Sequence, residues 1–208
     1  FPMKKISLLL AFVIVQNLWS QKQPNAIKIT YERISNGTKL TQEPILVYAD
    51  INQTLLTNAA IIAKKAPFPI ELTQINRPEN HILQWAQVKE NKAIQTIDST
   101  SVSKQSFEFL TDTKKILGYT CKKAKTISNS NTIELWYTND LGIKGAPTVL
   151  GQNLGLVLEI TRNNNFTIQA VAIEKLKTIP EQVKIPNIKT NATDVVSYRD
   201  FLWKSKFQ

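Results

Sequence analysis

The stretch Ala26–Ser35, AIKITYERIS, decides the fold class of this chain. Apolar and polar side chains alternate along it, and the apolar face carries Ile27, Ile29 and Tyr31. This period of two is typical of a β-strand with one buried face. Asn36-Gly37 follows directly, and this dipeptide is the strongest short sequence signal for a β-hairpin. We therefore expect a strand followed by a tight turn.

The same signals recur along most of the chain. Short apolar or alternating stretches, separated by turns rich in Pro, Gly or Asn, predict strands at residues 44–49, 82–88, 93–98, 106–110, 118–126, 132–138, 154–161 and 166–173. Helix signals are scarce, and the best candidate follows Thr193 or Asp194 near the C-terminus. The sequence thus predicts a mainly β fold. We expect a large antiparallel sheet, curled or closed into a half-open barrel, with few helices and one of them near the C-terminus.

Residues 1–20 have the layout of a cleavable signal peptide. Lys4 and Lys5 precede an apolar run, and the small Ser20 stands at the expected cleavage position. The run is about ten residues long, whereas a membrane-spanning helix needs about 20. No cysteine follows the run, so no lipoprotein anchor is expected. We therefore expect a periplasmic, secreted or outer-membrane-associated product that is not transmembrane, with residues 21–208 forming a single β-rich domain.

The chain is basic, with a formal net charge of +10, and its positive charge comes mainly from lysine. Arginine, the side chain preferred for bidentate contacts with phosphate and guanine, is scarce. The lysines are spread along the chain rather than gathered in one segment. This pattern indicates a solvated, lysine-rich surface, and no nucleic-acid partner is expected.

Few residues of the chain suit a catalytic or metal site. His81 is the only histidine, which excludes a two-histidine zinc site, and Cys121 is the only cysteine. Cys121 lies in the middle of a predicted strand, so we interpret it as a small buried residue. The alternative is a nucleophilic pair of Cys121 and His81. The acidic residues are scattered, so we expect no metal, no cofactor and a protein that is not an enzyme.

Three segments carry a more specific signal: residues 114–124 (KKILGYTCKKA), 134–138 (ELWYT) and 151–160 (GQNLGLVLEI). Together they resemble the GLPGLI family of exported Bacteroidota proteins. The family-motif positions in this chain are Gly118, Tyr119, Cys121, Gly155, Leu156 and, in place of Ile, Val157. The motif is degenerate, because Gln152, Asn153 and Leu154 replace its Gly, Leu and Pro. At the level of the fold, the pattern also resembles LolA-like half-barrels, the periplasmic carriers of lipoproteins.

The resemblance implies an exported cell-envelope protein without an established activity. Among the aromatic residues of the predicted strands, Trp85, Trp136 and Tyr137 are the candidate ligand contacts. Trp136 and Tyr137 point to opposite faces of one strand, so we expect one of the two to be a core residue and the other a rim residue or a ligand contact. The predicted function is non-enzymatic binding of an apolar or amphipathic ligand, such as a lipid or lipoprotein, in the concavity of the sheet. The alternative is an interaction or accessory subunit that docks onto an outer-membrane or secretion assembly.

Overall fold

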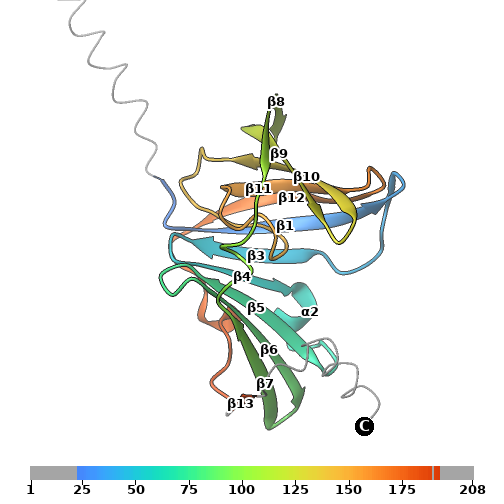
Figure 1. The fold of residues 1–208 in the computed structure, drawn as a ribbon. Coiled ribbons are helices and arrows are strands. Elements are labelled where there is room, and N and C mark those ends of the chain that lie inside the picture. Colours follow the sequence, from blue (N-terminus) through green and yellow to red (C-terminus); the bar gives the residue numbers. More distant parts are fainter. Residues whose placement is uncertain (1–22, 189, 193–208) are drawn as a thin grey trace, which may run out of the picture.

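In a computed structural model, which describes residues 23–188 and 190–192, the chain forms one sheet of 13 strands (Figure 1). In chain order, the strands are β1 (Ala26–Ser35), β2 (Thr38–Lys39), β3 (Ile45–Asp50), β4 (Gln53–Asn58), β5 (Ile70–Asn76), β6 (His81–Lys89), β7 (Lys92–Asp98), β8 (Glu108–Ile116), β9 (Tyr119–Ser128), β10 (Asn131–Thr138), β11 (Leu156–Arg162), β12 (Phe166–Leu176) and β13 (Thr190–Ala192). Across the sheet they follow the order β13-β7-β6-β5-β4-β3-β1-β12-β11-β10-β9-β8, and β2 pairs with β1.

The prediction of a mainly β fold with one large antiparallel sheet is confirmed. Only the pairing of β13 with β7 is parallel among the described strands. The sheet is open, with β8 and β13 at its two edges. The helices in the described residues are the short α2 (Ala59–Ile62) and the 3-10 helix η1 (Glu181–Val183), and none is long and apolar enough to cross a membrane. The predicted signal peptide and C-terminal helix lie outside the described residues.

The local sequence signals explain the central strand and its turns. The apolar face of β1 is fully buried, since Ile29 and Tyr31 are both 0% exposed. Asn36 and Gly37 have φ angles of 48° and 78°, and Asn163 and Asn164, between β11 and β12, have 50° and 58°. Tight hairpin turns require positive φ at their central residues, which Asn and Gly adopt most readily.

Strand β5 was not expected from the sequence. Pro67 and Pro69 precede it directly, and prolines usually mark the end of regular structure. The strand begins at the next residue and alternates between apolar Ile70 and Leu72 and polar Glu71 and Thr73. β8 also runs further than expected, to Ile116 rather than residue 110.

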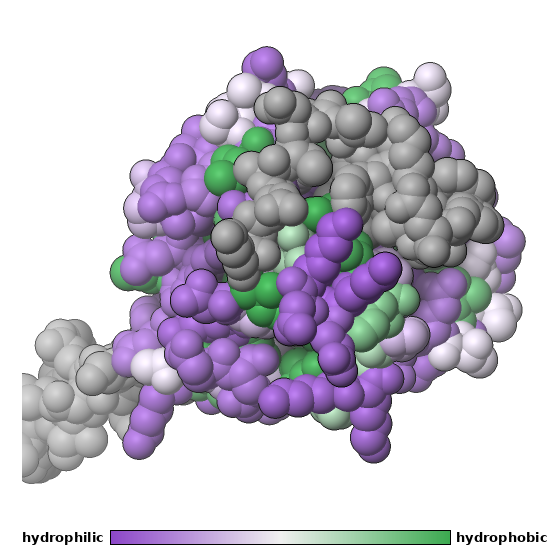
Figure 2. Space-filling model, turned by 90° about the horizontal axis from the view of Figure 1, so that it is seen from below, coloured by the Kyte–Doolittle hydropathy of each residue, from purple (hydrophilic) through white to green (hydrophobic). Residues whose placement is uncertain are grey.

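Two irregular segments cover opposite faces of the sheet. The segment 139–155, between β10 and β11, places Leu141 and Ile143 against the buried face of β1. The segment 177–188, after β12, places Ile179 and Val183 against Leu46 of β3 and its neighbours. Leu46 is opposite Thr30, on the other side of β1 from Ile29, so the two covers lie on different faces. Seen from below, the described surface is mostly hydrophilic, with apolar side chains in small patches (Figure 2).

Candidate functional site

A cavity of about 350 Å³, here called the polar cavity, lies on the face covered by the segment 139–155. It lies where β4 ends and β5 begins. Most of its lining side chains carry hydrogen-bonding groups: Arg33, Gln42, Glu43, Asn58, Glu71 and Thr73. The β4–β5 register places Leu56 opposite Thr73, and Glu71 lies two residues before Thr73 on the same face. Carboxylate, amide, guanidinium and hydroxyl groups therefore surround one open space.

Several of these side chains are held by the fold. Arg33 Nη1 donates to the Glu43 carbonyl oxygen at 2.7 Å, which ties β1 to the loop before β3. Burial lowers the pKa of the Arg33 guanidinium from its ordinary value. Asn58 Oδ1 accepts a hydrogen bond from the Ile61 backbone nitrogen at 2.9 Å and caps α2. These two hydrogen bonds hold the Arg33 and Asn58 side chains in the cavity wall.

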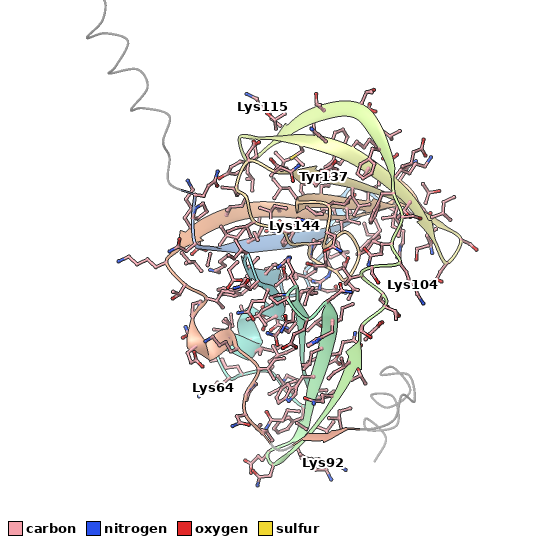
Figure 3. The ribbon with its side chains drawn as sticks, turned by 60° about the vertical axis from the view of Figure 1, so that its left-hand side comes forward. Lys64, Lys92, Lys104, Lys115, Tyr137 and Lys144 are labelled. Carbon is pink, nitrogen blue, oxygen red and sulfur yellow. The ribbon has the colours of Figure 1, made fainter. Side chains whose placement is uncertain are left out.

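A second cavity of about 170 Å³, here called the cationic cavity, lies on the same face near the other end of β5. Its polar lining side chains are Asn76, Arg77, Asn80, His81, Lys144 and Asn153. Ile75 also lines this cavity and follows Thr73 by two residues, about 7 Å along a strand. The two cavities are therefore neighbours along one face of β5. Figure 3 shows Lys144 near the middle of the molecule.

Arg77 connects the segment 139–155 to the sheet. Its Nη2 donates to the Lys144 carbonyl oxygen at 2.6 Å and to Thr54 Oγ1 at 2.7 Å, and its Nη1 donates to the Asp50 carbonyl oxygen at 3.4 Å. Arg77 Nε is buried and has no hydrogen-bond partner among the described residues. Burial lowers the pKa of Arg77 to about 10, and the nearby charge of Asp50 partly opposes this effect. His81 Nδ1 lies 3.1 Å from Glu79 Oε2.

A third cavity, here called the apolar cavity, lies on the opposite face and has a volume of about 460 Å³. It is enclosed by the sheet, by the chain around α2 and by the segment 182–188. Trp85, one of the predicted ligand residues, lines this cavity opposite Leu72 and is 1% exposed. Trp85 Nε1 and Thr57 Oγ1 are buried without a hydrogen-bond partner in the described part of the chain.

The other two predicted ligand residues lie elsewhere and do not join Trp85. The Trp136 ring is flanked by the Lys114 and Lys123 ammonium groups, at 4.5 Å and 5.6 Å from the ring centroid. Tyr137 is buried, at 7% exposed, in a separate cluster under the segment 139–155. The structure therefore distributes the three aromatic residues over different parts of the sheet.

The family-motif residues occupy turn and core positions. Gly118 has φ 85° in the turn between β8 and β9, where Tyr119 begins the next strand. Cys121 is fully buried, and burial raises its pKa to about 11. Gly155 accepts a hydrogen bond from the Gly145 nitrogen at 3.0 Å, and the buried Leu156 and Val157 follow it into β11.

The sequence interpretation missed the residues that line the polar and cationic cavities. The alternation of Glu71 and Thr73 with apolar neighbours was a usable signal for one wall, because it marks a strand with a polar face. Arg77 and Lys144 carry no such signal. They are 67 positions apart in the sequence and meet only in the folded chain.

An open antiparallel sheet with ligand-sized cavities on its faces defines a class of β-sheet domain rather than a specific protein. The family model described as "N-glycanase peptide, N-terminal domain" matches residues 29–200, and the chain belongs to this family. A solved structure of PNGF-II in space group P21 is 41% identical, with a TM-score of 0.82, and the match covers 87% of this chain and 34% of that chain. A second, in space group C2, is 42% identical, with a TM-score of 0.81 and coverage of 86% and 33%. No curated protein matches.

This chain thus spans about a third of the length of the PNGF-II chains. The assignment to the GLPGLI family is wrong, because both the family model and the solved structures point to PNGF-II. The motif had a physical basis that is not specific to one family. Gly118 and Gly155 occupy a turn and a strand entry, and Cys121 is a core residue, positions that sheets of many families share.

The functional predictions based on that resemblance are also corrected. The predicted function as a lipid or lipoprotein carrier is wrong, and so is its alternative, an accessory subunit of an envelope assembly. The chain belongs to an N-glycanase family instead. The prediction that the protein is not an enzyme is wrong at the level of the family, because the family is named after an enzyme, N-glycanase. Export through a signal peptide and the lack of a nucleic-acid partner remain predictions.

Proposed function

We propose that this chain is the N-terminal domain of an N-glycanase and that it binds the glycan of the glycoprotein substrate. Cleavage of the bond between glycan and asparagine belongs, in this proposal, to another part of the enzyme. The observation that carries the proposal is the polar cavity on a domain of this family. The chemistry of that cavity supports a sugar as its ligand.

Sugar rings present hydroxyl groups, each of which both donates and accepts hydrogen bonds. A binding site therefore needs donors and acceptors side by side. In the polar cavity, Glu71 supplies carboxylate acceptors, Arg33 supplies donors, and Gln42 and Thr73 supply both. Fixed side chains lose less conformational entropy when a ligand binds. The hydrogen bonds of Arg33 and Asn58 provide such preorganisation.

A recognition role also fits the two residues considered as a nucleophilic pair. A nucleophilic cysteine needs a lowered pKa, because the thiolate is the reactive form. Cys121 has the opposite property, since burial raises its pKa to about 11. His81 is engaged with Glu79 beside the cationic cavity and is not hydrogen-bonded to Cys121 in the described contacts.

Titration calorimetry with an N-glycopeptide and the same peptide without its glycan tests the proposal. We expect the glycopeptide to bind and the peptide without its glycan not to bind. Glu71→Gln replaces a charged carboxylate acceptor by an amide donor, and Thr73→Val removes a hydroxyl group. We expect each to weaken binding about tenfold, or about 1.4 kcal/mol. Glu90→Gln, in the exposed turn between β6 and β7, is the matched control and leaves the affinity unchanged.

Two results would overturn the proposal. The first is equal binding of the two peptides, or variants of Glu71 and Thr73 that bind as tightly as the natural chain. The second is release of glycan from the glycopeptide by this chain alone, because that activity would place the cleavage here.

A further inference from the structure

The cationic cavity adds a property to the glycan site, and its role rests on the function proposed above. We propose that this cavity binds an acidic group of the glycan, a carboxylate or a sulfate carried on a sugar. The domain then prefers acidic glycans over neutral ones. The charge of the cavity, the unpartnered Nε of Arg77 and the size of the cavity support this assignment.

The charge of the cavity is positive. Its charge comes from Arg77 and Lys144, and no Asp or Glu belongs to its described lining. No described carboxylate lies within ion-pairing distance of the Lys144 ammonium. Lys144 is exposed, so its side chain is able to move toward a ligand. An anion that enters this space meets the positive charge of Lys144, which has no ion-pair partner among the described residues.

Two acidic residues lie near the cavity but outside its described lining. Glu79 contacts His81 from outside the lining, and its side chain is 63% exposed. Asp50 faces Arg77, but its Oδ1 accepts hydrogen bonds from the backbone nitrogens of Asn52 and Gln53 at 2.7 Å and 2.8 Å. The Asp50 carboxylate therefore holds the turn between β3 and β4 and also offsets part of the charge of Arg77, whereas the charge of Lys144 remains unpaired among the described residues.

One hydrogen-bond donor of Arg77, its Nε, has no partner among the described residues. Nη2 and Nη1 of Arg77 donate to Thr54 and to backbone oxygens, which holds the guanidinium in one orientation. A buried donor without a partner costs free energy, and a hydrogen bond to a charged oxygen removes that cost. An acidic group that reaches Nε therefore gains more from Arg77 than a neutral group does.

The size of the cavity selects one group rather than a whole glycan. Its volume is about 170 Å³, whereas sites for drug-sized ligands are about 300–1,000 Å³. The polar cavity, whose lining residue Thr73 lies two residues before Ile75 on the same face of β5, offers the space for the neighbouring sugar. The amides of Asn76, Asn80 and Asn153 add donors around the acidic group.

The experiment compares three glycopeptides by calorimetry at 0.15 M salt: one neutral, one with a terminal carboxylate-bearing sugar and one with a sulfated sugar. We expect at least one acidic form to bind about tenfold more tightly than the neutral form. The two acidic forms distinguish the carboxylate from the sulfate. Lys144→Gln is expected to reduce the preference while keeping the backbone carbonyl of residue 144, the atom to which Arg77 donates. Replacing Arg77 itself would remove the anchor of the segment 139–155.

Lys92→Gln is the matched control, since it removes the same charge far from the cavity (Figure 3). Lys92 is opposite Lys89, and Lys89 is at the other end of β6 from His81, about 26 Å away. At this salt concentration the Debye length is about 8 Å, so a contribution from Lys92 is screened. Lys92→Gln is expected to keep the preference for acidic glycans.

The outcomes separate the two proposals. Equal affinity for all three glycopeptides, or equal loss of preference in both lysine variants, would overturn the acidic-group site and leave the glycan-binding function standing. If no glycopeptide binds, the proposed function fails. Titration with sodium sulfate against sodium chloride at constant ionic strength then still tests the cavity. Sulfate that fails to bind, or binds the Lys144→Gln variant as tightly as the natural chain, would overturn the site.

Discussion

The substitution Gly155→Ala should destabilise the fold because of a close backbone approach. Gly155 is the residue at which the segment 139–155 enters β11, with φ 156°. A Cβ atom there would lie 2.7 Å from the Thr138 carbonyl oxygen and 2.5 Å from Asn139 Oδ1. The carbonyl belongs to the last residue of β10, whose ladder with β11 holds it in place. Relief of the clash therefore requires the two strands to separate.

A second glycine allows the magnitude to be worked out. Gly118 also has a positive φ, 85°, but nothing lies within 4 Å of its Cβ position. Gly118→Ala therefore costs only the backbone strain, about 1 kcal/mol. Gly155→Ala adds overpacking, which costs about 1–3 kcal/mol, to a similar strain. We expect a total of about 3 kcal/mol for Gly155→Ala, about 2 kcal/mol more than for Gly118→Ala.

Urea unfolding followed by tryptophan fluorescence measures both variants. The midpoint should fall further for Gly155→Ala, with an unchanged dependence of the free energy on urea. In thermal unfolding, the 2 kcal/mol difference corresponds to roughly 4–8 °C for a chain of this size. Equal losses in the two variants would refute the steric reasoning, since both would then reflect strain alone.

Three further predictions concern buried or hydrogen-bonded polar groups. Tyr31→Phe removes the buried hydroxyl that donates to the Val157 carbonyl oxygen at 2.6 Å, and urea unfolding should show a loss of about 1–3 kcal/mol; unchanged stability would contradict this role. Burial raises the pKa of Cys121 to about 11, so Ellman's reagent at pH 8 should label the thiol only after unfolding in urea, and labelling of the folded chain would contradict it. Hydrogen bonds from Ser101 and Thr100 lower the pKa of Asp98 to about 2. The stability that these hydrogen bonds add is therefore present above about pH 4 and is lost as the pH falls toward 2. Asp98→Asn should remove that part of the pH dependence in acid unfolding, and an identical pH profile would contradict the assignment.

The class of fold was accessible from the sequence because its signals are local. Alternation along β1 and the Asn-Gly and Asn-Asn turns involve residues that are neighbours in the chain. β5 was missed because Pro67 and Pro69 dominate the local pattern, although both precede the strand and leave its ladder intact. The resemblance to the GLPGLI family failed for a related reason, since its glycines report turn geometry rather than ancestry.

The candidate site was not accessible in the same way. Glu71 and Thr73 lie on one strand, but the polar cavity needs Arg33 from β1 and Asn58 from β4 beside them. The predicted ligand residue Trp85 has the aromatic character of a binding residue, yet its position on the opposite face follows from the register with β5. Aromatic character alone does not distinguish a core residue from a ligand contact.

The sequence by itself determined that this protein is built from short antiparallel strands joined by tight turns, because strand period and turn chemistry act over a few residues. The tertiary structure decided which polar side chains share a cavity. Arg77 meets the carbonyl of Lys144 across 67 residues of chain, and the segment 139–155 is placed by packing on β1. Such contacts depend on burial and hydrogen bonding between distant segments, and no local pattern encodes them.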